Sequence, residues 1–261
     1  MSTAPRPLDE LREEIDTIDR QLHALIQQRG GLAADIAEIK KLESIDRVRP
    51  GREAVLLRAL VERHVGEFPT GALLRMWREM ISSLVLMEMP EYSVAVYAFG
   101  EDQACWDLAR DQFGSRTPMT THLSARDAIS QVLTGATSLA VVPSPTEEAP
   151  GNWWQNLCAP NAPKILYRLP FFGHGNARGG KNGAPDAFAI GYMTPEATGD
   201  DQTLVVLETS GNISRSGLAE ILASADLRPR FLVPTMAGAQ FCYAEIEGFV
   251  ESGDPRVTLL L

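Results

Sequence analysis

The stretch "LREEIDTIDRQLHALIQQRGGLAADIAEIKK", residues 11–41, decides the fold of the N-terminal region. Its apolar residues recur every three or four positions, which predicts one long amphipathic α-helix. The helix expected over residues 8–41 is about 50 Å long, more than a three-helix unit of one chain can cover. We therefore expect two copies to pack these helices together in an intertwined homodimer. The apolar stripe consists of Ile15, Ile18, Leu22, Leu25, Leu32 and Ile36.

Two cations, Arg29 and Lys40, lie on this apolar stripe. They are 11 residues apart, which is about three helical turns, so both point to the same side of the helix. Each has an ordinary explanation when taken alone. An arginine can extend its charged head past the edge of a core, and a lysine is favoured at a helix C-terminus. Their presence together on a core-facing stripe is a first indication of a binding pocket.

Two further helices are expected over residues 52–65 and 72–89. The first of these opens with Arg52 and Glu53, and the second carries Glu88 on its apolar face. Together with the two cations on the first helix, these groups predict a polar pocket inside a helical bundle, suited to a small dianion. The sequence places no nucleophile with a general base and no metal-ligand cluster beside them. We therefore expect a site that binds and positions its ligand and is not built for covalent catalysis.

Composition limits the class of protein. The chain has 261 residues, 44% of them hydrophobic, and a formal net charge of −10, which fits a globular protein that does not bind nucleic acid. Its cysteines, Cys105, Cys158 and Cys242, lack the spacing of a metal site or a disulfide framework and favour a reducing, cytoplasmic compartment. We expect no membrane segment and no signal peptide, because no sufficiently long apolar run is present.

After the third helix, β-rich runs alternate with helical patterns, which predicts a mixed α/β region and a domain boundary near residues 89–92. The glycine-rich stretch 173–185 is expected to be a mobile loop, since it lacks the strand and spacing of a phosphate-binding loop. The expected strands lie within residues 92–100, 137–144, 164–172, 186–193, 203–208 and 241–249, and the helices within 124–133 and 214–225.

Residues 8–89 resemble the all-helical class of chorismate mutases. The resemblance rests on the segments "LREEIDTIDRQLHALIQQR", "AEIKK", "RPGREAVLL" and "MWREMISSLVLME". In that family the enzyme is a dimer with exchanged long helices, and it converts chorismate to prephenate without a cofactor. The resemblance implies that Arg29, together with an Arg12 supplied by the second copy, holds the two substrate carboxylates, with Arg52 supporting them.

The resemblance also implies that Lys40 and Glu88 face the ether oxygen of the breaking bond, while Glu53 holds the ring hydroxyl. These residue types suit a [3,3] rearrangement, which needs a flexible dianion held in a compact shape and charge stabilised on the departing oxygen. Many members carry a glutamine at the ether oxygen, and a glutamate can donate there only when it is protonated. Leu84 replaces a frequent serine, and residues 49–51 replace a loop that often contains an aspartate.

The order of parts resembles the bifunctional chorismate mutase and prephenate dehydratase. It implies a mutase domain at residues 1–91, a degenerate dehydratase-like domain at 92–200 and a partial ACT-like regulatory domain at 201–261. The threonine-arginine-phenylalanine element of the dehydratase aligns with residues 186–188, where only the phenylalanine, Phe188, is kept. Loss of the hydroxyl and the guanidinium predicts that this region does not dehydrate prephenate.

Three functions follow from this sequence. The leading one is a chorismate mutase of phenylalanine and tyrosine biosynthesis, with prephenate as product and a C-terminal region that is structural or regulatory. The second is a bifunctional chorismate mutase and prephenate dehydratase. The third is a non-catalytic sensor of an aromatic metabolite.

Overall fold

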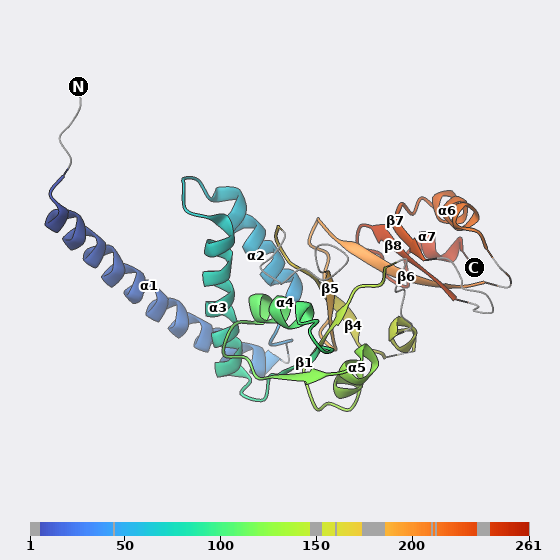
Figure 1. The fold of residues 1–261 in the computed structure, drawn as a ribbon, viewed down its shortest axis with the longest axis horizontal. Helices are drawn as coiled ribbons and strands as arrows, with labels where there is room; N and C mark the ends of the chain where they lie inside the picture. The colour runs from blue at the N-terminus through green and yellow to red at the C-terminus, as the bar shows by residue number, and fades with distance from the viewer. Residues whose placement is uncertain are drawn as a thin grey trace, which may run out of the picture.

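The chain forms three regions that follow one another from end to end of the molecule: a helical region, a five-stranded sheet with its helices, and a three-stranded sheet (Figure 1). The predicted loop at 173–185 falls, after its first residue, outside the described residues. The computed structural model describes residues 6–43, 45–146, 153–159, 161–173, 186–209, 211, 213–233 and 241–260.

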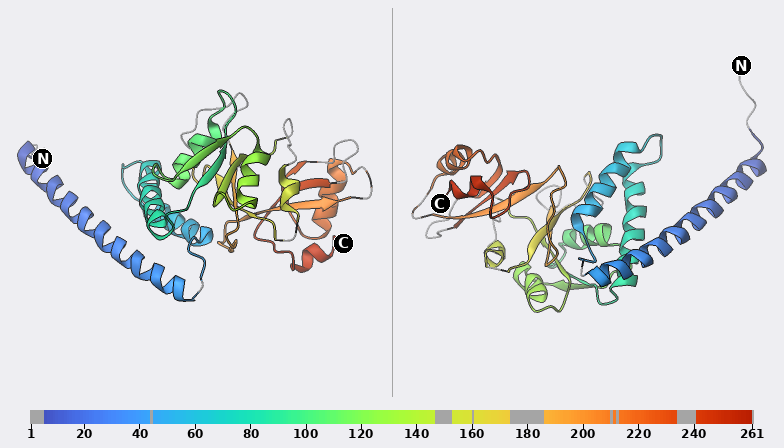
Figure 2. Two further views of the ribbon diagram at one scale, coloured as in Figure 1. Left: turned by 90° about the horizontal axis from the view of Figure 1, so that it is seen from below. Right: turned by 180° about the vertical axis from the view of Figure 1, so that it is seen from behind.

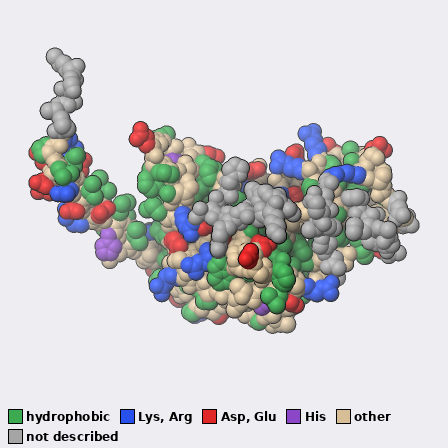
Figure 3. All heavy atoms as spheres, viewed as in Figure 1, with side chains coloured by type: hydrophobic (Ala, Val, Ile, Leu, Met, Phe, Trp, Pro, Cys, Tyr) green, Lys and Arg blue, Asp and Glu red, His purple; other side chains and the backbone are tan. Residues whose placement is uncertain are grey.

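The first helix, α1, spans Leu8–Glu43 and buries none of its residues within the single chain. It extends away from the rest of the molecule in every view (Figures 1 and 2), with hydrophobic side chains exposed along it (Figure 3). Ile15 is 56% exposed and Leu25 is 60% exposed. The long helix and its uncovered apolar stripe are therefore as predicted, whereas the dimer that would cover the stripe stays a prediction.

The second and third helices, α2 (Pro50–Arg63) and α3 (Thr70–Glu88), pack around a small core of Leu57, Leu60 and Leu74. Proline suits the first turn of α2, because no intrahelical partner exists there for the backbone N–H that it lacks. Most of the exposed large hydrophobic side chains of the helical region lie on α1.

The most buried face of α3 differs from the predicted one. Leu74, Arg78 and Ser82 are its buried residues. Leu74 packs against α2, whereas α4 lies beside Arg78 and Ser82. The helices approach so closely that a Cβ at Gly114, which follows α4 and has φ +80°, would overlap the hydroxyl of Ser82. The predicted face is only half-buried and consists of Leu73, Trp77, Met80, Leu84 and Glu88.

The five-stranded sheet has the order β2-β1-β3-β5-β4. Strand β1 pairs in parallel with β2 and β3, whereas β5 is antiparallel to β3 and β4. The sequence analysis identified neither β2 nor α4. Strand β2 is a short polar edge strand without apolar alternation, so it gives no strand signal. The elements are β1 (Val94–Tyr97), α4 (Ala104–Phe113), β2 (Met119–His122), α5 (Ala125–Leu133), β3 (Leu139–Pro143), β4 (Lys164–Leu169) and β5 (Ala187–Gly191).

Both faces of this sheet are covered. Val94 and Val96 of β1 pack on the side of α4, while Ala95 between them packs on the side of α5, as the alternation of side chains in a strand requires. The α4 side also receives the C-terminal end of α3 through Val85 and Met89. The helical region and the α/β region therefore share one continuous core.

The three-stranded antiparallel sheet has the order β6-β8-β7. Helix α6 covers one face, and the other packs against Trp154 and the first sheet through Val233 and Tyr243. The sequence order strand, helix, strand, strand is the one predicted for this region. Its elements are β6 (Gln202–Glu208), α6 (Arg215–Ser224), β7 (Pro229–Val233), β8 (Phe241–Glu247) and α7 (Pro255–Thr258), with the 3-10 helix η1 (Trp153–Leu157) preceding them.

Two features are absent from the described part of the chain. None of its helices is both long enough and apolar enough to cross a membrane. The same residues contain no group of three or more His, Cys, Asp or Glu side chains placed to hold a metal ion.

Candidate active site

Three of the six predicted site residues meet where three helix ends converge. Lys40 comes from the last turn of α1, Glu53 from the first turn of α2 and Glu88 from the last turn of α3. The Lys40 ammonium lies 3.9 Å from Oε2 of Glu88 and donates a hydrogen bond to the carbonyl of Arg47. Its charge also acts on the Glu53 carboxyl, whose pKa is raised by burial and which Lys40 helps to keep ionised.

Glu88 presents a buried carboxyl oxygen that has no hydrogen-bond partner among the described residues. Its side chain is 17% exposed, and its Oε1 is buried and accepts no hydrogen bond from any residue that the structure describes. A buried polar atom in this condition costs free energy, so native structures contain few of them outside functional sites. The other oxygen of this carboxyl group, Oε2, is the one 3.9 Å from the Lys40 ammonium, at the place where the sequence predicted contact with the substrate.

Glu53 is held from one side by two donors. Arg78 donates to its Oε2 at 3.0 Å, and the hydroxyl of Tyr167 donates to the same oxygen at 2.9 Å. Burial raises the pKa of Glu53, and Arg78, Tyr167 and Lys40 oppose that rise. Burial also lowers the pKa of Arg78.

Arg78 lies in a closed, aromatic environment. Its side chain is 6% exposed, and its guanidinium carbon is 4.8 Å from the ring centre of Phe171 and 5.8 Å from that of Tyr167. When the Gln112 amide is oriented to fit the hydrogen-bond network, its oxygen accepts from both terminal nitrogens of Arg78 at 3.0 Å. The sequence analysis missed Arg78 and Tyr167, and the one available signal was the position of Arg78 on the face of Leu74.

The start of α2 is also held by the α/β region. Arg49 forms an ion pair with Glu196, and a Cβ at Gly51 would lie 2.8 Å from the Cβ of Glu196, too close for ordinary contact. Arg58 donates to the hydroxyl of Thr198 at 2.6 Å. Residues 49–51 therefore dock onto the segment between β5 and β6.

The three remaining predicted residues are arginines that lie apart from this cluster in the single chain. Arg12 is exposed near the start of α1, 3.4 Å from Asp9. It precedes Lys40 by 28 residues, or about 42 Å along the helix axis. Arg29 is half-buried on the Lys40 side of α1, and Arg52 is exposed on α2. Among the described residues, neither Arg29 nor Arg52 has an ion-pair partner.

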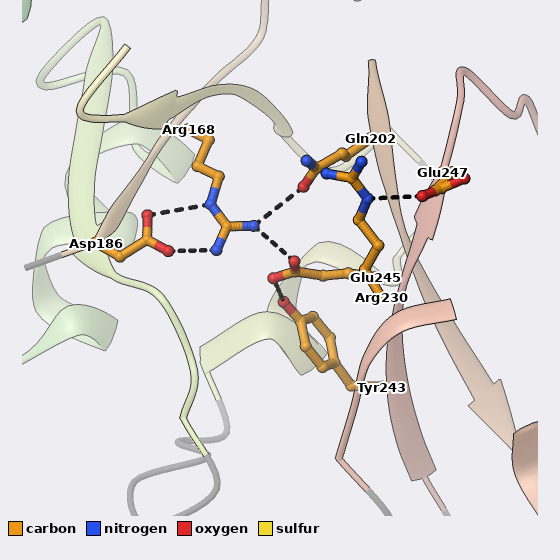
Figure 4. Close-up of polar contacts among 7 residues, drawn as sticks. All are labelled: Arg168, Asp186, Gln202, Arg230, Tyr243, Glu245 and Glu247. Atoms are coloured by element: carbon orange, nitrogen blue, oxygen red, sulfur yellow. Dashed lines mark hydrogen bonds and ion pairs between the residues drawn. The ribbon is translucent and has the colours of Figure 1, made fainter. Parts of the chain in front are cut away.

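A second polar cluster joins the two sheets (Figure 4). Arg168 of β4 pairs with Asp186 and donates to Glu245 of β8 at 2.6 Å and to Gln202 at 3.1 Å. The hydroxyl of Tyr243 donates to Glu245 at 2.9 Å. Asp186 immediately precedes β5, the strand that pairs with β4, and the Arg168–Glu245 pair connects the first sheet to the second.

Residues 11–89 match the family described as Chorismate mutase type II, so the N-terminal helical region is a chorismate mutase type II domain. A "Bifunctional chorismate mutase/prephenate dehydratase" of Aquifex aeolicus is 34% identical over 140 residues, covering 52% of this chain and 38% of that protein. The protein of that description from Pseudomonas aeruginosa is 30% identical over 141 residues, with the same two coverages. The chain thus spans well under half the length of these curated relatives.

A solved structure described as "GqqA- a novel type of quorum quenching acylases" has a TM-score of 0.40 and 12% identity, over 64% of this chain and 85% of that one. A similarity at this level carries no information about function.

Proposed function

We propose that this protein is a chorismate mutase that converts chorismate to prephenate for phenylalanine and tyrosine biosynthesis. The observation that carries the proposal is the convergence of Lys40, Glu53 and Glu88 within the matched domain, with one buried oxygen of Glu88 unpaired among the described residues. An ammonium and a carboxyl group together suit an ether oxygen that gains negative charge as its bond to carbon lengthens.

The rearrangement breaks one C–O bond and forms one C–C bond within the same molecule, and no proton is transferred. Catalysis is then a matter of conformation and charge. The Lys40 ammonium stabilises the oxygen, and Glu88 lies beside it, 3.9 Å from that ammonium. Glu53 accepts a hydrogen bond from the ring hydroxyl, and Arg29 and Arg52 hold carboxylates, a task for which the planar guanidinium is suited.

We also propose that the active form is a homodimer in which Arg12 of one copy enters the site of the other. The exposed stripe of α1 supports this, as does the distance along the helix that separates Arg12 from Lys40. Co-expression of Arg12→Ala and Lys40→Ala chains tests it, because a mixed dimer contains one complete site. About a quarter of wild-type activity is expected from statistical pairing, and a mixture no more active than either variant alone would exclude an exchanged arginine.

The direct test is to incubate the full-length protein with chorismate and to follow both the loss of chorismate and the appearance of phenylpyruvate. Enzyme-dependent loss with accumulation of prephenate is the expected result. A wild-type chain that does not accelerate this loss would exclude catalysis and leave a non-catalytic sensor as the remaining function.

The second candidate is a bifunctional enzyme. It is favoured by the names of the relatives and by an alignment of 140 residues, longer than the helical region alone. The Arg168–Asp186 ion pair argues against it, because a group that could anchor the prephenate carboxylate is already neutralised. Phenylpyruvate formed above the spontaneous rate would establish the second activity. Its absence leaves the α/β region, with its ACT-like end, a structural or regulatory role.

A further inference from the structure

The α/β region contributes a side chain to the immediate surroundings of the mutase site. Tyr167 lies on β4, more than a hundred residues after Glu53 in the sequence, and its hydroxyl reaches the Glu53 carboxylate at 2.9 Å. Arg78 of α3 donates to the same oxygen at 3.0 Å. Within the described residues, both bonds go to Oε2, so the other carboxylate oxygen, Oε1, is left for a ligand.

We propose that Arg78 and Tyr167 are positioning residues that orient Glu53 toward the ring hydroxyl of chorismate, so the α/β region is part of the mutase site. This inference rests on the proposed function for the identity of the ligand. The contacts among the three side chains are independent of that function. Neither positioning residue is expected to touch the substrate.

The two donors are themselves held in place. The Tyr167 ring packs edge-on against Phe113 of α4, with centroids 5.8 Å apart and an interplanar angle of 79°. The Arg78 guanidinium is confined by Phe171 and by its bonds with Gln112. A carboxylate fixed by two immobile donors loses little conformational freedom when a ligand binds, which is how supporting residues increase affinity.

A purely structural ion pair would explain these contacts less well. Burial raises the pKa of Glu53 and lowers the pKa of Arg78, so both groups are held away from the solvent that would stabilise their charges. Removing a buried ion pair in favour of apolar residues is often neutral or stabilising. The charged groups that face Glu53 are Arg78 and Lys40, and the nearby phenols are Tyr167 and Tyr92.

The test compares Tyr167→Phe with Tyr243→Phe in the full-length protein. Both tyrosines donate to a glutamate at 2.9 Å, and each substitution removes only the hydroxyl. Tyr167→Phe removes a donor that favours ionised Glu53, so the titration midpoint of Glu53 should move to higher pH. The KM for chorismate should rise about 10-fold, with kcat little changed, and the acidic limb of the kcat/KM profile should move in the same direction. Tyr243→Phe should alter none of these.

The midpoint is measured by carbon-13 NMR of glutamate side chains, with the Glu53 signal assigned by its loss in Glu53→Gln. An unchanged Glu53 midpoint in Tyr167→Phe would overturn the inference. If the wild-type protein does not convert chorismate, the proposed function fails, yet the midpoint still decides whether Tyr167 and Arg78 control Glu53. The two failures are therefore distinguishable.

Discussion

The molecule contains two clusters built from the same three kinds of side chain, a glutamate, an arginine and a tyrosine. In the helical region Glu53 accepts from Arg78 and Tyr167, and between the sheets Glu245 accepts from Arg168 and Tyr243. The hydrogen bond from the tyrosine hydroxyl to the glutamate is 2.9 Å long in both clusters. The clusters differ in the charges around them, and that difference separates a site that can take a dianion from one that cannot.

In the first cluster the Glu53–Arg78 pair lies near the Lys40–Glu88 pair, so the two cations and two carboxylates balance. Arg29 and Arg52, which lie apart from this cluster on the same helices, have no ion-pair partner among the described residues and could supply positive charge to a dianionic ligand. In the second cluster one guanidinium serves two carboxylates, Asp186 and Glu245 (Figure 4), so the local sum is negative. A similar set of side chains thus forms a candidate binding site in one place and an internal connection in the other.

The largest expected effect is that of Lys40→Ala on catalysis. Loss of one preorganised cation at an oxygen that gains charge should lower kcat about 100-fold or more. Lys41→Ala is the matched control, because Lys41 is the adjacent, exposed lysine of the same helix, and it should change kcat little. Steady-state kinetics together with circular dichroism makes the measurement. Equal effects of the two substitutions would remove Lys40 from the site.

The second cluster should respond in stability instead. Arg168→Met leaves Glu245, whose side chain is 4% exposed, without its cation. A loss of about 2–3 kcal/mol in the free energy of unfolding is expected, somewhat below the cost of breaking a fully buried pair because Arg168 is partly exposed. Denaturant unfolding measures it, and mutase activity below the transition should be preserved.

Arg230→Met is the control for this second prediction. Arg230 and Glu247 form an exposed pair at 2.9 Å in the same neighbourhood (Figure 4). Such pairs contribute at most about 1 kcal/mol, so the variant should unfold nearly as the wild type does. A fall in mutase activity in Arg168→Met under folded conditions would show that the second cluster also acts on the active site.

Sequence reasoning identified the parts of the fold that are encoded locally. The three N-terminal helices follow from apolar spacing. Lys40 and Glu88 were predicted because charged groups on apolar faces are conspicuous, and Glu53 because it opens the second helix beside Arg52. Arg78 and Tyr167 were not found, because their role depends on α3 and β4 coming together from distant parts of the chain. The face of α3 that the sequence singled out is half-buried, and its fully buried side depends on contacts with both α2 and α4, of which α4 was not predicted.

Glu88→Gln should have a smaller effect than Lys40→Ala, within about tenfold of wild-type kcat, because the amide keeps the size of the side chain and can donate a hydrogen bond to the ether oxygen. The measurement is the same steady-state assay. A loss as large as that of Lys40→Ala would indicate that the Glu88 carboxylate acts through its charge, for instance by holding Lys40 at 3.9 Å.

The smallest expected effect concerns the pH dependence of stability in the first cluster. Burial raises the pKa of Glu53, so the folded chain keeps a proton there at pH values where the unfolded chain has lost it. The stability linked to this proton is fully present below the ordinary glutamate pKa of about 4.3 and is lost as pH rises through the raised value. Glutamine does not titrate, so Glu53→Gln should become more stable relative to wild type as pH rises across that window.

A tenfold change in the acid dissociation constant of Glu53 corresponds to about 1.4 kcal/mol, or a few degrees in Tm. Thermal unfolding of both proteins from acidic to neutral pH measures the Tm of Glu53→Gln minus the Tm of wild type. If this value falls as pH rises, Arg78 and Tyr167 lower the pKa of Glu53 by more than burial raises it.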